Sequence, residues 1–214
     1  MPTSSSIFTP RKICSICKRP KNVCLCQWIQ PIENSIEIGI LQHPTETAQI
    51  KGTAKIATLS LQHCRLWVGE DFTAEKTLHD WLAKGTVLML YPQTQALNES
   101  NKVDNRAVTY EIEQVLLQEH GVNLKILVLD GTWRKTHKIL MQNAFLQFIN
   151  RLALHPRHPS NYQIRKQRKA GLSTIEAIYQ TLSQLEQNET KFLPLMHAFQ
   201  KMIDQQLAYR STVT

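Results

Sequence analysis

The chain has 214 residues, which is enough for one ordinary domain with a buried core and a small additional module. Lysine and arginine total 25 against 17 for aspartate and glutamate, and the resulting charge of +8, with a pI near 9.3, favours a polyanionic partner. No apolar run approaches the length of a membrane span, and the amino-terminal residues lack the apolar core of a signal peptide. We therefore expect a protein without a membrane span, located in the cytoplasm.

The positive charge is concentrated in two blocks. Residues 1–32 contain five basic and no acidic side chains, and residues 131–175 contain nine basic and no acidic side chains. The remainder of the chain is therefore net acidic. A chain that is basic in two blocks and acidic elsewhere suggests a patterned nucleic-acid surface, with an ordinary solvated face as the alternative.

Four of the five cysteines lie within the first block, in the pattern Cys14-x2-Cys17-x6-Cys24-x-Cys26. Two close pairs on knuckle-like turns can place four thiolates around one tetrahedral ion, and zinc suits an all-sulfur tetrahedral site. Because such a site has no open coordination position, we expect a structural zinc module over residues 1–30, followed by a larger domain over residues 31–214. An iron–sulfur cluster and a pair of disulfides are the alternatives, and disulfides need an oxidising compartment.

Downstream of the cysteines, apolar strand-like runs alternate with amphipathic helical stretches. This alternation predicts an α/β fold with a mostly parallel sheet and flanking helices. We expect strands at residues 36–41, 64–68, 86–92, 124–129 and 151–155, and helices at residues 45–62, 74–83, 110–120, 133–141, 174–185 and 194–207. The polar stretch 93–105 is expected to be a loop.

The apolar run 126–129 is followed by Asp130, Gly131, Thr132 and Trp133. The glycine permits a sharp turn, and the threonine is placed to cap a helix. A carboxylate and an indole at the carboxyl end of a buried strand lie where open α/β sheets bind ligands. A turn-capping aspartate and a core tryptophan are equally compatible with this segment taken alone.

Two other predicted strands end in a similar way. One ends at His43-Pro44 and another at Tyr91-Pro92, and proline cannot continue a strand ladder. Because the strands are predicted to be parallel, we expect these two ends and the end at Asp130-Gly131 to open on one edge of the sheet.

The second basic block contains residues 156–169, with five lysines or arginines, two prolines and Tyr162. Arginine makes bidentate contacts with phosphate and tyrosine can stack on a base, so this segment favours a nucleic-acid contact over a solvated loop. Ser173-x-x-Glu176 then forms a capping box, in which the serine oxygen accepts from the Glu176 N–H and the glutamate carboxylate accepts from the Ser173 N–H. We therefore expect Glu176 to have a structural role.

Six motifs in this order resemble the DTW-domain tRNA-uridine aminocarboxypropyltransferases, and the resemblance covers nearly the whole chain. The motifs are the cysteine pattern with Pro20 inside it, His43-Pro44-x-Glu46, Tyr91-Pro92, Asp130-Gly-Thr132-Trp133, Tyr162-x-x-Arg165 and Leu172-Ser-Thr-x-Glu-Ala177. The resemblance implies a SPOUT-like, knotted α/β domain that binds S-adenosylmethionine. It also implies transfer of the 3-amino-3-carboxypropyl group to N3 of a uridine in tRNA, with release of methylthioadenosine.

The resemblance also implies roles for individual residues. The catalytic set is Asp130, as general base or positioning residue, with Thr132 and Trp133. Cofactor contacts are expected from Leu90, Tyr91, Pro92, Asp130, Gly131, Arg165, Leu172, Ser173 and Thr174. Contacts with tRNA are expected from Arg11, Lys18, Arg19, His43, Arg134, Arg157, Tyr162, Arg165, Lys166 and Arg168. The structural zinc is expected on Cys14, Cys17, Cys24 and Cys26.

Two other functions remain open at this point. A SPOUT-like RNA methyltransferase would share the fold and the cofactor but would release S-adenosylhomocysteine. A non-catalytic zinc-ribbon RNA-binding protein would not bind S-adenosylmethionine.

Overall fold

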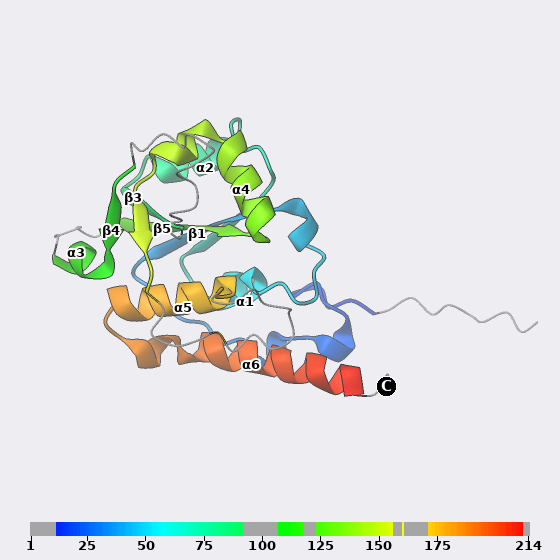
Figure 1. Ribbon diagram of the computed structural model, residues 1–214. Helices are drawn as coiled ribbons and strands as arrows, with labels where there is room; N and C mark the ends of the chain where they lie inside the picture. The colour runs from blue at the N-terminus through cyan, green and yellow to red at the C-terminus, as the bar shows by residue number, and fades with distance from the viewer. Residues whose placement is uncertain (1–11, 92–106, 118–122, 156–159, 161–170, 212–214) are drawn as a thin grey trace, which may run out of the picture.

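The computed structural model describes residues 12–91, 107–117, 123–155, 160 and 171–211. Within them, a six-stranded sheet with the order β2-β1-β5-β3-β6-β4 lies between two layers of helices (Figure 1). All neighbouring strands in this order pair in parallel, which confirms the predicted α/β class. The strands are β1 (Glu37–Gln42), β2 (Cys64–Val68), β3 (Thr86–Leu90), β4 (Thr109–Glu111), β5 (Leu124–Asp130) and β6 (Arg151–Ala153).

Helices cover both faces of the sheet (Figure 1). One face carries α2 (Lys76–Leu82) and α4 (Trp133–Gln142), and the other carries α1 (Ala54–Ser60), α5 (Thr174–Leu185) and α6 (Glu189–Ser211). The short helix α3 (Ile112–Leu117) follows the edge strand β4. Single 3-10 turns are η1 (Lys21–Val23), η2 (Cys26–Trp28), η3 (Pro44–Glu46) and η5 (Ala144–Phe148). Among the described residues, no helix combines the length and the apolar character needed to cross a membrane.

Strand β5 lies near the middle of the sheet because it is apolar on both faces. Ile126 and Val128 belong to the hydrophobic cluster shared with α1, α5 and α6, whereas Leu127 and Leu129 belong to the cluster shared with α2 and α4. A strand covered on both sides requires a continuous apolar run, and this is the pattern that the sequence shows at 126–129.

The carboxyl ends of β1, β5 and β3 lie side by side. Gln42 and Asp130 are register partners at the ends of β1 and β5. Tyr91 directly follows β3, which is the neighbour of β5 on its other side. The prediction that His43, Tyr91 and Asp130 mark three strand ends on one edge is therefore confirmed.

Residues 45–62 do not form the single helix expected from the sequence. The chain instead makes η3, whose N-cap is His43, and a turn leads from it to α1, whose N-cap position is Thr53. In the turn, the N–H of Gly52 donates to the carbonyl of Gln49 at 2.8 Å, and a Cβ on Gly52 would lie 3.0 Å from that carbonyl oxygen. The tight turn at this glycine ends the first helical segment before the second begins.

Several other elements differ from expectation at their boundaries, and the clearest differences are at β4 and α6. Residues Thr109–Glu111 form β4, where a helix was expected to begin at Tyr110; pairing with β6 at the sheet edge decides the conformation of this three-residue segment. Helix α6 begins at Glu189, so Pro194 lies inside it rather than at its start. The loop expected at 93–105 lies outside the described residues.

Gly39 in β1 generates a stability prediction. A Cβ at this position would lie 2.7 Å from Cη2 of Trp81, a side chain that is only 3% exposed. Trp81 is held by an edge contact with Trp67 at 5.5 Å and by the ammonium of Lys125, 4.9 Å from its ring centroid. Because the indole cannot move aside, Gly39→Ala should lower the free energy of unfolding by about 1–3 kcal/mol in urea denaturation.

Gly171→Ala is the matched control, because a Cβ at Gly171 meets no heavy atom of the described residues within 4 Å. Its free energy of unfolding should stay near that of the wild type. Equal stability of the two variants would contradict the packing described for Gly39.

Candidate functional site

A cavity of about 350 Å³ opens at the carboxyl edge of the sheet. The ends of β3, β5 and β6 form one side of it, and the start of α4 and the residues leading into α5 form the other. The described lining residues are mostly apolar: Leu90, Tyr91, Val128, Leu129, Gly131, Trp133, Thr136, Leu152, Leu154, Gly171, Leu172, Ser173, Thr174 and Ala177. A mainly apolar cavity with few polar groups suits a ligand with an aromatic or aliphatic body.

Most of the residues predicted to contact the cofactor line this one cavity. They come from three distant parts of the chain, which the sheet edge brings together: Leu90, Tyr91, Gly131, Leu172, Ser173 and Thr174. Pro92 and Arg165 lie outside the described residues. The apolar lining residues Val128, Leu152, Leu154 and Ala177 were not predicted as site residues, because an apolar strand end and a core residue have the same sequence pattern.

Asp130 is the last residue of β5 and is only 6% exposed. Each of its carboxylate oxygens accepts a hydrogen bond: Oδ2 from Gln42 Nε2 at 2.8 Å, and Oδ1 from Thr174 Oγ1 at 2.5 Å. Thr174 also lines the cavity, so the carboxylate is connected to the cavity wall through this hydroxyl. Gln42 is not among the predicted site residues, although its position at the end of a strand, directly before His43-Pro44, is a usable signal.

Trp133 is the first residue of α4, lines the cavity and is 42% exposed. Its ring stacks on that of Tyr91, with centroids 5.4 Å apart and an interplanar angle of 27°. The guanidinium of Arg151 lies 5.4 Å from the Tyr91 ring centroid. Trp133 is therefore a wall of the cavity and not a core residue. Thr132 occupies the N-cap position of α4 as predicted, but its exposed side chain makes no capping hydrogen bond.

His43 is buried, and both of its ring nitrogens have partners inside the protein. Nδ1 accepts from the Thr45 N–H at 3.3 Å, so Nε2 carries the proton and donates to Glu70 Oε1 at 2.6 Å. A hydrogen bond from Lys138, supported by His43, holds the pKa of Glu70 below its usual range. The backbone N–H of His43 donates to the carbonyl of Asp130 at 3.0 Å, which ties this turn to the end of β5. A contact of His43 with RNA stays a prediction.

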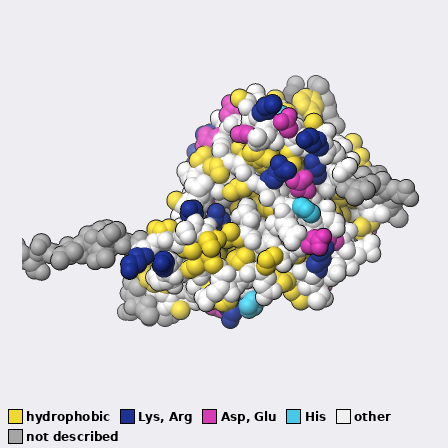
Figure 2. All heavy atoms as spheres, turned by 180° about the vertical axis from the view of Figure 1, so that it is seen from behind, with side chains coloured by type: hydrophobic (Ala, Val, Ile, Leu, Met, Phe, Trp, Pro, Cys, Tyr) yellow, Lys and Arg dark blue, Asp and Glu magenta, His cyan; other side chains and the backbone are white. Residues whose placement is uncertain are grey.

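Of the other residues predicted to contact RNA, Lys18 and Arg134 are exposed and Arg19 is buried. Two lysines on α4 are paired: Lys135 lies 2.8 Å from Glu46, and Lys138 contacts Glu70. In the space-filling view, acidic and basic side chains lie next to one another over much of the upper half of the face shown (Figure 2). Several predicted contacts lie outside the described residues: Arg11, Arg157, Tyr162, Arg165, Lys166 and Arg168.

The capping box at the start of α5 is confirmed. Ser173 Oγ accepts from the Glu176 N–H at 3.4 Å, and Glu176 Oε2 accepts from the Ser173 N–H at 2.7 Å. Ser160 Oγ donates to the same carboxylate at 2.8 and 3.0 Å. The carboxylate of Glu176 therefore occupies the position where the helix N-terminus would attract an anion, which gives this residue the expected structural role.

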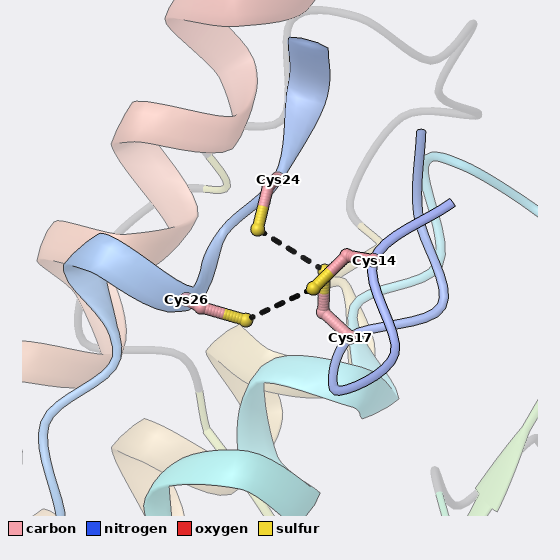
Figure 3. Close-up of side chains that lie close together, drawn as sticks. All are labelled: Cys14, Cys17, Cys24 and Cys26. Carbon is pink, nitrogen blue, oxygen red and sulfur yellow. Dashed lines mark hydrogen bonds between the residues drawn. The ribbon is translucent and has the colours of Figure 1, made fainter. Parts of the chain in front are cut away.

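The four amino-terminal cysteines converge on one point (Figure 3). The sulfurs of Cys14 and Cys26 lie 3.7 Å apart, those of Cys17 and Cys24 lie 3.6 Å apart, and all four lie within 4.8 Å of one another. Four sulfurs bound at about 2.3 Å to a tetrahedral ion would lie about 3.8 Å apart. The cysteines are free thiols, so the disulfide alternative is not realised, and the cluster fits a metal ion.

Local backbone geometry builds this cluster. Lys18 has a positive φ of 58°, which turns the chain so that its N–H donates to the carbonyl of Cys14 at 3.0 Å. The N–H groups of Cys17 and Ile16 stabilise the Cys14 thiolate and lower its pKa to about 6. Burial and the neighbouring sulfurs raise the pKa of Cys26 to about 12. A cation among the four sulfurs would favour their thiolate forms.

The cysteine segment is attached to the rest of the structure through core contacts. Leu25, between two of the cysteines, is fully buried in the cluster that includes residues of α5 and α6. Gln205 of α6 donates to the carbonyl of Cys24 at 3.5 Å. A parallel bridge joins Ile32 to Leu61 after α1. The division at residue 30 stays a prediction.

Comparison with known proteins agrees with the family resemblance of the sequence motifs. A family model described as the DTW domain matches residues 11–207. Proteins named tRNA-uridine aminocarboxypropyltransferase 2 from Macaca fascicularis and Mus musculus are 29% and 28% identical over 210 residues, which is 95% of this chain and 66% of each relative. The protein of the same name from Drosophila melanogaster is 30% identical over 184 residues, covering 82% of this chain and 67% of the relative. The chain thus spans about two thirds of the length of these relatives. No solved structure matches it.

The hydroxyl of Tyr91 generates a prediction about pH. It is buried with no hydrogen-bond partner among the described residues, and burial raises its pKa from 10.0 to about 12. The folded state therefore holds this proton more tightly than the unfolded state, so stability falls as the pH rises from about 10 to about 12. Tyr91→Phe removes this loss and should also be as stable as the wild type, within about 0.5 kcal/mol, at neutral pH. Urea denaturation at several pH values measures both effects.

Tyr179→Phe is the control. The pKa of Tyr179 is also raised to about 12, first by burial, but its hydroxyl donates to Glu189 at 2.8 Å. This variant should therefore lose stability at neutral pH, by about 1 kcal/mol. If Tyr91→Phe showed the same loss, its hydroxyl would have a partner and the prediction would be wrong.

Proposed function

The chain belongs to the DTW domain family, and from this we propose that it is a tRNA-uridine aminocarboxypropyltransferase. In this proposal, S-adenosylmethionine is the co-substrate, N3 of a uridine in tRNA is the acceptor, and methylthioadenosine is released. The names of the three relatives and their coverage of most of this chain support the proposal.

The single observation that carries the proposal is the meeting of two motifs at one cavity. Asp130-Gly-Thr-Trp133 and Leu172-Ser-Thr174 are about 40 residues apart in the sequence, yet residues of both line the same cavity, and a hydrogen bond joins Asp130 to Thr174. Stacked aromatic rings of Trp133 and Tyr91 on its wall suit an adenine or a uracil ring.

When bound, S-adenosylmethionine supplies a carbon next to a sulfonium, which is already a good leaving group. The chain therefore mainly has to orient the reacting atoms and to accept the proton of N3–H. We assign proton acceptance to Asp130, stacking to Trp133, and positioning of the helix start to Thr132. The cofactor is held by Leu90, Tyr91, Pro92, Gly131, Arg165 and the backbone of Leu172, Ser173 and Thr174.

We assign the basic residues to tRNA phosphates, since the two basic blocks lack acidic side chains that would repel RNA. Contacts with tRNA come from Arg11, Lys18, Arg19, His43, Arg134, Arg157, Tyr162, Arg165, Lys166 and Arg168. The SPOUT-like knotted topology, the division into a zinc module (1–30) and a catalytic domain (31–214), and the cytoplasmic location belong to the same proposal. The parallel sheet and the return of residues 171–177 to its carboxyl edge support the topology.

We assign zinc to the four-cysteine cluster as a structural ion. The sulfur spacing and the all-sulfur ligand set support it, because zinc prefers tetrahedral sites of this kind. The ion would neutralise the thiolates and cross-link the two turns that carry them.

The released nucleoside tests the reaction. Incubation of the full chain with unmodified tRNA and S-adenosylmethionine should give methylthioadenosine, identified by mass spectrometry. S-adenosylhomocysteine would instead identify a methyltransferase, and the absence of both products would favour a non-catalytic RNA-binding protein. Asp130→Asn should reduce turnover about 10²-fold or more with an unchanged circular dichroism spectrum.

Asp71→Asn is the matched control, because Asp71 is an exposed carboxylate that accepts from the Thr73 N–H, and an asparagine oxygen can accept the same bond. Its turnover should equal that of the wild type. Near-normal turnover by Asp130→Asn would contradict the assignment of the proton acceptor.

The metal assignment has a separate test. The purified chain should contain about one zinc ion, measured by atomic emission, and Cys17→Ser should lose most of it because the site then lacks one of four thiolates. Cys17→Ser should also unfold at a lower temperature. Cys64→Ser is the control, since Cys64 lies in β2, outside the cluster. Full zinc content in Cys17→Ser, or iron in the wild type, would contradict the assignment.

A further inference from the structure

The connection between Asp130 and the cavity runs through Thr174. Asp130 is 6% exposed, whereas Thr174 is half-buried and lines the cavity. Thr174 Oγ1 lies 2.5 Å from Asp130 Oδ1, within hydrogen-bond distance. A bound molecule therefore contacts Thr174, and the carboxylate of Asp130, which is not among the described lining residues, lies behind it.

The direction of this hydrogen bond follows from the chemistry of the two groups. An ionised carboxylate has only acceptor sites, so the hydroxyl proton of Thr174 must point at Asp130 Oδ1. Gln42 Nε2 donates to the other carboxylate oxygen at 2.8 Å, which fixes the plane of the carboxylate. With its proton directed at Asp130, the Thr174 oxygen keeps its lone pairs for a donor on another side. A hydroxyl polarised in this way is a better acceptor for an N–H group than a free alcohol.

The capping of α5 does not use this hydroxyl. Ser173 is the N-cap residue, and its Oγ accepts from the Glu176 N–H. Thr174 is the first helical residue, where any good helix former serves equally well. The contact between Thr174 and Asp130 therefore needs an explanation other than helix capping.

We propose that Thr174 is a catalytic residue that relays the N3 proton of the acceptor uridine to Asp130. The proposal rests on the proposed aminocarboxypropyl transfer. As the N3–H bond breaks, its proton bonds to Thr174 Oγ1, and the hydroxyl proton of Thr174 passes to Asp130 Oδ1. The electron pair left on N3 forms the new bond to the methylene carbon, and the pair of the broken carbon–sulfur bond stays on sulfur, which becomes a neutral thioether.

Three variants of the full chain test the relay. Thr174→Val removes the hydroxyl but keeps the shape of the side chain, and should lower kcat about 10²-fold or more with unmodified tRNA. Thr174→Ser keeps a hydroxyl and should retain kcat within a few-fold. Asp130→Asn should resemble Thr174→Val. Affinity for S-adenosylmethionine, measured by calorimetry without tRNA, should stay within a few-fold of the wild type in both Thr174 variants.

A second test varies the acidity of the uridine N3–H, because a purely structural role of Thr174 would not make the kcat deficit depend on that acidity. Replacing uridine by 5-fluorouridine in the tRNA makes N3–H more acidic, so that it needs less help to lose its proton. The deficit of Thr174→Val should therefore shrink about tenfold or more with the fluorinated tRNA, and it should also shrink as the pH is raised. Thr174→Ser should show neither change.

The outcomes separate the relay from the proposed function. If the wild type releases no methylthioadenosine, the proposed function is wrong and the relay falls with it. If the wild type is active and Thr174→Val has normal kcat, the relay alone is wrong. A deficit in Thr174→Val that is the same for both tRNAs at every pH, or that appears only as weaker cofactor binding, would also overturn the relay.

Discussion

The burial of β5 on both faces is the constraint on which the site depends. Ile126 and Val128 pack on one side of the sheet and Leu127 and Leu129 on the other, so the strand can occupy only an interior position. Its neighbours are therefore β1 and β3, and their carboxyl ends lie beside its own. The polar residues at these ends meet because the apolar residues before them are fixed in register.

Carboxylates near the cavity are held by several hydrogen-bond donors each. Asp130 accepts from Gln42 of β1 and from Thr174 of α5, and Glu176 accepts from Ser173 and Ser160. Because a buried carboxylate is costly without hydrogen bonds, these contacts offset that cost and fix the orientation of each group. The same contacts join the start of α5 to the sheet, so the helix and the edge form one wall.

Patterns that depend on local chemistry predicted the structure well. The apolar runs of β2, β3 and β5, the capping box at Ser173 and the convergence of four cysteines were all recovered from the sequence. Features set by distant contacts were missed: β4 exists because it pairs with β6, and Gln42 matters because Asp130 is its register partner. The division of the helix expected at 45–62 was also missed, although the turn at Gly52 that divides it is local. Six of the ten expected RNA contacts lie outside the described residues, so they stay predictions.

The packing of Leu25 fixes the position of the cysteine cluster relative to the core. A fully buried leucine between two of the cysteines, and a hydrogen bond from Gln205 of α6 to Cys24, anchor the cluster to the same core that supports the cavity. The separation between cluster and cavity is therefore set by packed side chains and not by a linker. A long molecule that contacts both the cysteine cluster and the cavity must therefore fit the fixed distance between them.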